Sequence, residues 1–324
     1  MSFLSPRPAS ECAEYPTRSC LQSSQFITVL SLVGWRPEEG DVLPVSKACL
    51  RMCWVDRFDP LCQKFFMKGT TPNLPGILVD GTVQNQTRYK PICQLFNNAY
   101  RFATLYDTTK RIPVFSAYTF TGPPTDPRPD DPWMIEPQLD GVNNPVMQKI
   151  GGAHYEHQAG NYDYKRKNPL DYHAVNRGHL FPNSHAHNLD TQESTFTLTN
   201  IVPQDIKFNG GSWNDMEKNV RGKLMNDCIS NNGKIEAYVV TGAVPSSNNK
   251  LNDRVNIPEL LWTAYCCYNR NMNKRIAEAH WQWNKEIKKN TVNPVTLGKL
   301  EEMLNKYHKG KGVLVKVFPT NCPR

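Results

Sequence analysis

Alternating apolar and polar positions predict five β-strands along the chain. From Val114 to Phe120, for example, the side chains at every second position are Val, Ser, Tyr and Phe, and they are expected to share one face of an extended strand. The predicted strands cover residues 111–120, 194–203, 234–245, 260–268 and 312–318.

Two segments, residues 212–225 and 295–308, have the period of an amphipathic helix instead. The apolar stripe of the first consists of Trp213, Met216, Val220 and Leu224. Ser212 and Asp215 have the spacing of a capping box, which predicts that this helix begins at Ser212. Strands dominate and helices are inserted between them, so the predicted fold class is α+β with a mixed or antiparallel central sheet.

The chain of 324 residues is long enough for one large domain. Residues 1–58 show no sustained period, and we expect an N-terminal extension there and one domain at residues 59–324. The Pro-rich stretch 121–132 cannot enter a helix or a central strand, so it is predicted to be a surface loop of that domain. No apolar run approaches the roughly 20 residues that cross a bilayer, and no membrane span is expected.

The formal net charge is +8, from 38 Lys and Arg against 30 Asp and Glu. A basic excess of this size fits a partner rich in phosphate, although many proteins with neutral substrates share it. The charge therefore favours a nucleic-acid partner only slightly.

Ten cysteines are dispersed along the chain without a C-x-x-C pair. Such a set is typical of disulfides formed in an oxidising compartment, with buried free thiols in the cytosol as the alternative. Adjacent strand residues face opposite sides, so Cys266 and Cys267 are expected to bridge to different partners. With one glycosylation sequon, Asn85-Gln86-Thr87, this pattern predicts a secreted or extracellular protein, although the first residues lack the pattern of a signal peptide.

Basic and acidic side chains that suit phosphate chemistry stand close together at two places. His179 follows Arg177 by two residues, and Glu217 and Arg221 share one face of the predicted helix because they are four residues apart. A neutral imidazole is a suitable base near pH 7, and guanidinium groups bind phosphate oxygens in pairs. Phosphodiester hydrolysis needs such a base and such cations, so these four residues are candidates for it.

Two asparagines lie near these candidates in the sequence. Asn200 is predicted at the end of a strand and Asn209 just before the helix. The amide oxygen of Asn209 is a suitable ligand for a hard cation such as Mg²⁺, whose remaining waters a carboxylate such as Glu217 can hold. Taken one at a time, however, each candidate fits an ordinary structural role better: a turn or cap for the asparagines, a core histidine, or a solvated ion pair.

Taken together and in order, these motifs resemble the DNA/RNA non-specific endonuclease family. The matching residues are Arg177-Gly178-His179, the stretch 199–204, and the spaced residues Asn209, Trp213, Glu217 and Arg221. Longer stretches, including residues 93–120 and 133–140, resemble the endonuclease domain-containing 1 branch of that family. The resemblance covers roughly residues 60–322.

The resemblance implies a ββα-metal core, in which two strands and a helix hold a divalent ion. It implies that His179 is the general base, that Asn209 binds Mg²⁺ (or Mn²⁺) directly, and that Glu217 orders the waters of the metal. Arg177 and Arg221 would hold the phosphate. We therefore expect a metal-dependent endonuclease that cuts DNA, and RNA as well, with activity that falls below about pH 6 as the histidine gains a proton.

Two further positions qualify this expectation. Asn200 would support the catalytic site by hydrogen bonding. The family usually has Asp-Arg-Gly-His, and this chain has Asn176 in place of the aspartate. An amide keeps the shape and one acceptor oxygen but loses the charge, so activity is expected to be lowered without vanishing.

Two other functions stay open. Four histidines within 15 residues could bind zinc, although no Cys or acidic partner stands at a convincing spacing: His173, His179, His185 and His187. The second alternative is a nucleic-acid-binding protein on a nuclease fold that no longer cuts. Residues 270–324 carry 12 Lys or Arg against 4 Asp or Glu, a net +8, and could hold a phosphate backbone without cleavage.

Overall fold

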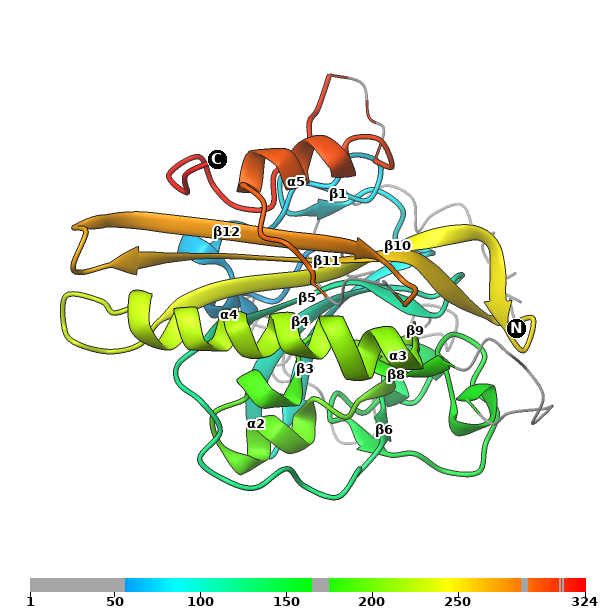
Figure 1. Cartoon of the computed structure of the whole chain (residues 1–324). Coiled ribbons are helices and arrows are strands. Elements are labelled where there is room, and N and C mark those ends of the chain that lie inside the picture. The colour runs from blue at the N-terminus through cyan, green and yellow to red at the C-terminus, as the bar shows by residue number, and fades with distance from the viewer. Residues whose placement is uncertain (1–55, 165–174, 287–290, 309, 311) are drawn as a thin grey trace, which may run out of the picture. The chain divides into compact units, whose positions relative to one another are not determined.

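The central element of the fold is a six-stranded antiparallel sheet (Figure 1). The computed structural model describes residues 56–164, 175–286, 291–308, 310 and 312–324. The strands lie in the order β12-β11-β10-β5-β4-β3. Their bounds are β3 Tyr89–Phe96, β4 Ala99–Asp107, β5 Ile112–Phe120, β10 Ala237–Leu251, β11 Val255–Asn269 and β12 Lys274–Trp283. The α+β class with an antiparallel central sheet is confirmed, as are the predicted strands at 111–120, 234–245 and 260–268.

Alternating side chains build one buried core on each face of this sheet. On β11, Trp262 and Cys266 belong to one core, and Leu261 and Cys267 belong to the other. Helix α5 (Leu297–Leu304) closes the first core and helix α4 (Asn214–Asp227) closes the second, so the two helices lie on opposite sides of the sheet (Figure 1). Each fully buried side chain of Leu or Phe size contributes roughly 1.5–3 kcal/mol to stability.

The expected single face from Val114 to Phe120 is wrong at its first residue. Tyr118 and Phe120 pack in the α4-side core, whereas Val114 packs in the opposite core together with its neighbour Phe115. The pairing of β4 with β5 shifts register between Leu105 and Tyr106, which adds one residue to β5 at this point. A β-bulge of this kind reverses the face on which the following side chains lie.

The predicted strand at residues 194–203 is wrong except at its end. Helix α2 (Leu189–Ser194) and a 3-10 turn (Leu198–Asn200) precede strand β9 (Ile201–Asp205), which pairs antiparallel with β8 (Val175–His179). The hydroxyls of Ser194 and Thr195 donate to the carbonyls of Thr191 and Gln192, at 2.8 and 2.7 Å. Such local hydrogen bonds of Ser and Thr compete with the strand conformation.

The predicted strand at residues 312–318 is also wrong, because only Lys316 forms a bridge, with Asn73. The backbone N–H of Val317 donates to the carboxylate of Glu301 at 2.9 Å, and that of Val315 donates to the Asn305 amide oxygen at 2.8 Å. Side chains in and just after α5 thus occupy the donors that a neighbouring strand would need.

The helix that carries Glu217 begins earlier than the capping box predicts. Asp205 is the cap, since the N–H of Phe208 donates to its carboxylate at 2.8 Å. The chain continues through α3 (Ile206–Phe208) and a π-helical turn (Asn209–Trp213) into α4. Phe208 and Trp213 are fully buried and draw this turn into the core, so Ser212 lies inside the helical run and caps nothing.

Three disulfides tie the described chain together. They join Cys62 to Cys93, Cys228 to Cys267, and Cys266 to Cys322. The prediction that the adjacent cysteines bridge to different partners is confirmed. The other four cysteines lie outside the described residues: Cys12, Cys20, Cys49 and Cys53.

Short elements complete the fold. The remaining strands are β1 Leu78–Val79, β2 Thr82–Val83, β6 Met134–Ile135 and β7 Gln148–Lys149, and the other 3-10 turns are Pro60–Phe65, Met67–Gly69, Pro137–Asp140, Asn161–Tyr164 and Asn183–His185. Residues Asp56–Arg324 form one compact unit. The predicted extension at 1–58 falls almost wholly outside the described residues and stays a prediction, as does the boundary at 59. None of the described helices is long and apolar enough to cross a membrane.

Candidate active site

The candidate site is built on the β8–β9 hairpin and the helix that follows it. His179 pairs with Ile201 across the hairpin, and Arg177 pairs with Pro203. Asn284 fastens the hairpin to the main sheet, because its amide donates to the carbonyls of Pro203 and Pro258, each at 3.0 Å. Two antiparallel strands and a helix therefore form one connected ββα unit beside the sheet.

Gly178 allows this hairpin to close. A Cβ atom at this position would lie 2.1 Å from Oε1 and 2.7 Å from Cβ of Gln204, closer than any side chain tolerates. Only glycine fits between Arg177 and His179 in this strand. Because side chains two positions apart in a strand lie on the same face, Arg177 and His179 both point to one side of the hairpin.

A cavity of about 480 Å³ opens over the ββα unit. Four of the predicted site residues line it, namely Arg177, His179, Asn209 and Glu217. Asn176 lines the cavity as well and is exposed. A hairpin and a helix that are separate in sequence thus contribute to one hollow.

The imidazole of His179 stands in an aromatic pocket. Its ring centroid lies 5.7 Å from that of Trp133 and 5.1 Å from that of Phe196. Burial, and then the positive charge of Arg128, lower its pKa from 6.5 to about 3. Its Nε2 atom is buried and without a hydrogen-bond partner in the described part of the chain. The ring is therefore neutral at physiological pH. With this pKa, activity that depends on the neutral ring is expected to fall only well below pH 6, and not near pH 6 as the ordinary pKa of histidine predicts.

Arg177 is held between two aromatic rings. Its guanidinium carbon lies 4.5 Å from the centroid of Trp133 and 5.2 Å from that of Tyr164. Its Nη2 donates to the Asn161 amide oxygen at 2.7 Å. Stacking and this hydrogen bond orient the guanidinium toward the cavity with little loss of rotamer freedom on binding an anion.

Asn209 and Glu217 bring oxygen atoms from the helical run to the same cavity. The Asn209 side chain is partly exposed in the π-helical turn, and none of the described residues forms a hydrogen bond with it. Glu217 lies two turns further along, and burial raises the pKa of its carboxyl from 4.5 to about 8. A nearby positive charge, such as a bound cation, stabilises the ionised form of a buried carboxyl and lowers its pKa again.

Arg221 stands at the rim rather than in the lining. Its Nη1 donates to the Ser184 carbonyl at 3.3 Å, and Ser184 itself lines the cavity. Among the ion pairs of the described residues, Glu217 and Arg221 are not joined, although they are four residues apart. The ordinary role of a solvated helical ion pair therefore does not describe them.

Asn200 is fully buried behind the site, and its side chain makes four hydrogen bonds. Its Oδ1 accepts from the Ser116 hydroxyl at 2.8 Å and from the Phe181 N–H at 2.9 Å. Its Nδ2 donates to the carbonyls of Phe181 at 3.1 Å and Thr195 at 3.0 Å. The amide therefore connects strand β5 to the segment directly after His179 and faces neither metal nor substrate.

The donor atoms in the cavity fit a hard divalent cation. An amide oxygen from Asn209 and a carboxylate from Glu217 are the ligand types that Mg²⁺ and Mn²⁺ prefer. In the described ranges, no group of three or more His, Cys, Asp and Glu gathers as zinc would require.

Two histidines of the zinc hypothesis, His185 and His187, lie outside the cavity lining and have hydrogen-bond partners of their own. His185 bonds the Tyr118 hydroxyl at 2.9 Å and the Glu217 carbonyl at 3.0 Å, so it fixes α4 to β5. His187 donates to the Pro123 carbonyl at 2.8 Å. His173 lies outside the described residues.

Several cavity residues were not predicted from the sequence, and two of them contact the predicted site residues or their aromatic neighbours. Arg128 comes from the Pro-rich stretch 121–132, which is predicted to be only a surface loop, and Trp133 follows that stretch directly; both line the cavity. The guanidinium of Arg128 lies 5.0 Å from the Phe196 ring centroid and pairs with Asp131 at 3.1 Å. An Arg within a Pro-rich stretch and a Trp directly after it were the available signal, but nothing in their spacing links them to His179.

Comparison with known protein families identifies the family of this chain. The family model described as DNA/RNA non-specific endonuclease matches residues 81–318. The chain therefore belongs to the DNA/RNA non-specific endonuclease family.

Named relatives are similar over part of their length. The human Endonuclease domain-containing 1 protein is 35% identical over 213 residues, and its mouse counterpart is 34% identical over 208. Each match covers 64% of this chain but only 38% of the relative. A solved structure titled "Crystal structure of the EndoG/EndoGI complex: Mechanism of EndoG inhibition" is 19% identical with a TM-score of 0.45, covering 67% of this chain and 86% of that one.

Proposed function

We propose that the protein is a metal-dependent endonuclease that hydrolyses phosphodiester bonds of DNA, and of RNA as well, without sequence preference. The observation that carries this proposal is the convergence of Arg177, His179, Asn209 and Glu217 on one cavity. These are a base, a cation and two oxygen donors, the set that phosphodiester hydrolysis needs.

His179 acts in this proposal as the general base. A lowered pKa keeps its imidazole neutral and able to accept a proton from an attacking water. Because Nε2 is buried, we assign the accepting role to the other ring nitrogen, Nδ1. Trp133 and Phe196 hold the ring at a fixed angle and exclude competing water from its buried edge.

Arginines around the cavity neutralise the scissile phosphate. Arg177 is oriented by its aromatic neighbours, Arg221 approaches from α4, and Arg128 adds a third guanidinium from the Pro-rich segment. Planar guanidinium groups bind phosphate oxygens in pairs. Contacts to phosphates carry no sequence information, which accounts for the proposed lack of sequence preference.

Asn209 and Glu217 hold the divalent ion in this proposal, Asn209 directly and Glu217 through the ion's waters. A bound Mg²⁺ or Mn²⁺ supplies a Lewis acid that stabilises negative charge at the reacting phosphate. Asn200 holds the segment directly after His179 against β5. The three disulfides support export, and we propose a secreted or extracellular location.

The test is cleavage of plasmid DNA and of a long RNA by the full chain, with Mg²⁺ and with EDTA. The wild type is expected to cut both only with the metal, and His179→Ala is expected to cut neither. His157→Ala is the matched control, because His157 is half-exposed and outside the cavity. Folded, oxidised wild type that binds nucleic acid in a salt-dependent way but leaves it uncut would support the non-catalytic binder instead.

A further inference from the structure

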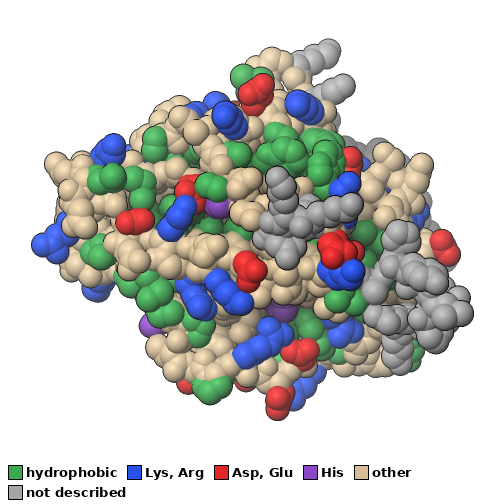
Figure 2. Space-filling view, in the orientation of Figure 1, with side chains coloured by type: hydrophobic (Ala, Val, Ile, Leu, Met, Phe, Trp, Pro, Cys, Tyr) green, Lys and Arg blue, Asp and Glu red, His purple; other side chains and the backbone are tan. Residues whose placement is uncertain are grey.

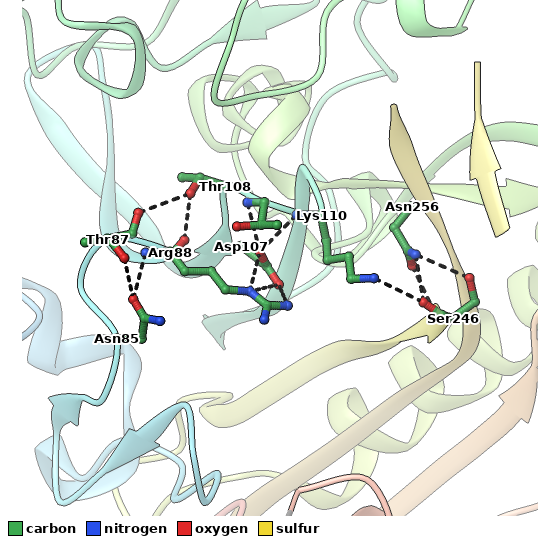
Figure 3. Close-up of polar contacts among 9 residues, drawn as sticks. Asn85, Thr87, Arg88, Asp107, Thr108, Lys110, Ser246 and Asn256 are labelled. Carbon is green, nitrogen blue, oxygen red and sulfur yellow. Dashed lines mark hydrogen bonds and ion pairs between the residues drawn. The ribbon is translucent and has the colours of Figure 1, made fainter. Parts of the chain in front are cut away.

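One sequence motif has no part in the cavity. Asn85-Gln86-Thr87 forms the turn between β2 and β3, and Asn85 and Thr87 are both exposed. The Asn85 side-chain oxygen accepts from the Thr87 hydroxyl at 2.6 Å and from the Arg88 N–H at 3.2 Å (Figure 3). The oxygen of the amide is therefore occupied within the turn.

The turn is fixed to the sheet by the residues that follow it. The Arg88 guanidinium bonds the Asp107 carboxylate at 2.6 to 3.0 Å, and the Thr108 hydroxyl donates to the Arg88 carbonyl at 2.9 Å (Figure 3). These contacts face the protein body. The Asn85 Nδ2 forms no hydrogen bond with any of the described residues, and in Figure 3 it points away from the dashed contacts.

We propose that Asn85 carries an N-linked oligosaccharide. In this reaction Nδ2 forms a bond to the anomeric carbon of an oligosaccharide carried on a polyprenyl diphosphate. The bond from that carbon to the diphosphate breaks, the amide loses one proton, and the diphosphate carrier leaves. The folded chain accepts the product without rearrangement, because the side chain is exposed and the hydrogen-bonded oxygen keeps its partners.

The state of the cysteines supports the same conclusion. All six described cysteines are paired, which is typical of proteins that fold in the oxidising compartment where N-linked oligosaccharides are attached. This inference therefore rests on the export proposed above, but not on nuclease activity.

The position of Asn85 predicts what the oligosaccharide does. Strand β3, which begins at Tyr89, is an outer strand of the six-stranded sheet, with a bridge to Val146 only at Leu95. A bulky hydrophilic group at the start of an edge strand hinders pairing with another sheet edge. None of the residues from 82 to 96 lines the candidate active site, so the oligosaccharide leaves the cavity open.

The experiment expresses the full chain in cultured animal cells behind a supplied export leader, so that entry into the secretory compartment is not the variable tested. Mass spectrometry then measures the peptide that contains residue 85. We expect an oligosaccharide on Asn85, and peptide N-glycosidase should remove it and leave Asp at that position. Thr87→Ala should abolish the modification and Thr87→Ser should keep it, which distinguishes loss of the acceptor motif from misfolding.

Asn143→Gln is the matched control, since Asn143 is exposed but lies outside any acceptor motif, and it should not change the mass of the attached sugar. Asn85→Gln should remove the sugar and leave the cleavage rate, if cleavage is found, unchanged. An unmodified Asn85 in protein whose Cys228–Cys267 disulfide has formed would overturn the proposal, because that chain has passed through the oxidising compartment.

Discussion

At the scale of single residues, His179 takes its protonation behaviour from apolar neighbours. Trp133 and Phe196 shield the ring from water, and the charge of Arg128 adds to the effect, so the pKa falls to about 3. Removing water from a histidine disfavours its charged form, and a nearby cation acts in the same direction. A base that stays neutral over the whole physiological range follows from this environment.

The pH dependence of cleavage should report this pKa. The active form of His179 is the neutral one, which is lost as pH falls through the folded-state pKa of about 3, well below the ordinary 6.5. At saturating Mg²⁺, which favours the ionised form of the Glu217 carboxyl, the rate should stay level from pH 8 to about 5 and decline only below that. The measurement is kcat/KM on a short duplex, with circular dichroism at each pH to show that the chain is folded. A half-maximal rate near pH 6.5 would contradict the buried, aromatic environment.

Asn176 offers a test of the family pattern at one position. It is exposed and lines the cavity, so Asn176→Asp adds a carboxylate without disturbing the core. We expect this change to raise cleavage about tenfold or less, an effect of up to roughly 1.4 kcal/mol on the barrier, because the added charge attracts the metal. Initial rates at several Mg²⁺ concentrations measure it, with Asn144→Asp outside the cavity as the control. An unchanged rate would contradict this expectation and show that the Asn176 amide supports cleavage as well as a carboxylate does.

At the scale of elements, the ββα unit depends on buried polar contacts to the main sheet. Asn200 links β5 to the segment after His179, and His185 links β5 to α4. Buried amides with all their hydrogen bonds made specify one arrangement of the elements that they join. The relative position of His179 and Glu217 therefore depends on β5, which contributes no lining residue of its own.

Asn200→Ala should weaken both stability and cleavage. The change leaves the buried N–H and carbonyl of Phe181 without their side-chain partner, at a cost of about 2–4 kcal/mol in the free energy of unfolding. Ser116→Ala removes only one of the four hydrogen bonds of Asn200, together with the bond between Ser116 and Thr104 at 3.1 Å, and should cost about 1–2 kcal/mol. Urea unfolding and cleavage at a temperature where both variants are folded provide the comparison. Equal losses of stability and of cleavage in the two variants would show that Asn200 does not hold the segment after His179 against β5.

At the scale of the whole molecule, several basic side chains are already paired with carboxylates of the same chain. Lys316 and Arg324, from the basic C-terminal stretch, both pair with Glu301, and Lys223 on α4 pairs with Glu278. Figure 2 shows Lys and Arg interspersed with Asp and Glu on the face that carries α4. Nucleic-acid binding should therefore depend on the few arginines at the cavity more than on the net charge.

The salt dependence of nucleic-acid binding should show how many of these arginines contact phosphates. With three phosphate contacts, from Arg128, Arg177 and Arg221, affinity for duplex DNA should fall roughly 40-fold between 50 and 200 mM salt, since each contact adds about 0.9 to the logarithmic slope. Fluorescence anisotropy with the His179→Ala protein measures binding without cleavage. Arg221→Ala should lower the slope by about one, whereas Lys316→Ala should not change it. A slope far above three would point to the basic C-terminal stretch as the binding surface.

Much of the fold could be read from local patterns, because hydrophobic period is a property of neighbouring residues. The alternation along 234–245 and 260–268 predicted two central strands, and the stripe through Met216 and Val220 predicted α4. Residues 194–200 and 312–318 have similar alternation and yet are not strands. The hydroxyls of Ser194 and Thr195 bond carbonyls of the preceding helical turn, and the side chains of Glu301 and Asn305 take the N–H groups of Val317 and Val315. Which side chain bonds which backbone group is decided by the tertiary structure, and the hydrophobic period of the segment does not reveal it.

The same division holds at the candidate site. Residue types and short spacings, together with the family resemblance, led to the prediction of Arg177, His179, Asn209 and Glu217, and these four residues do line one cavity. No spacing could bring Arg128 and Trp133 to His179, or move Arg221 from the lining to the rim, because these relations depend on how the Pro-rich segment and α4 pack across the hairpin. The pKa of His179 was out of reach for the same reason, since burial by rings that are distant in sequence sets it.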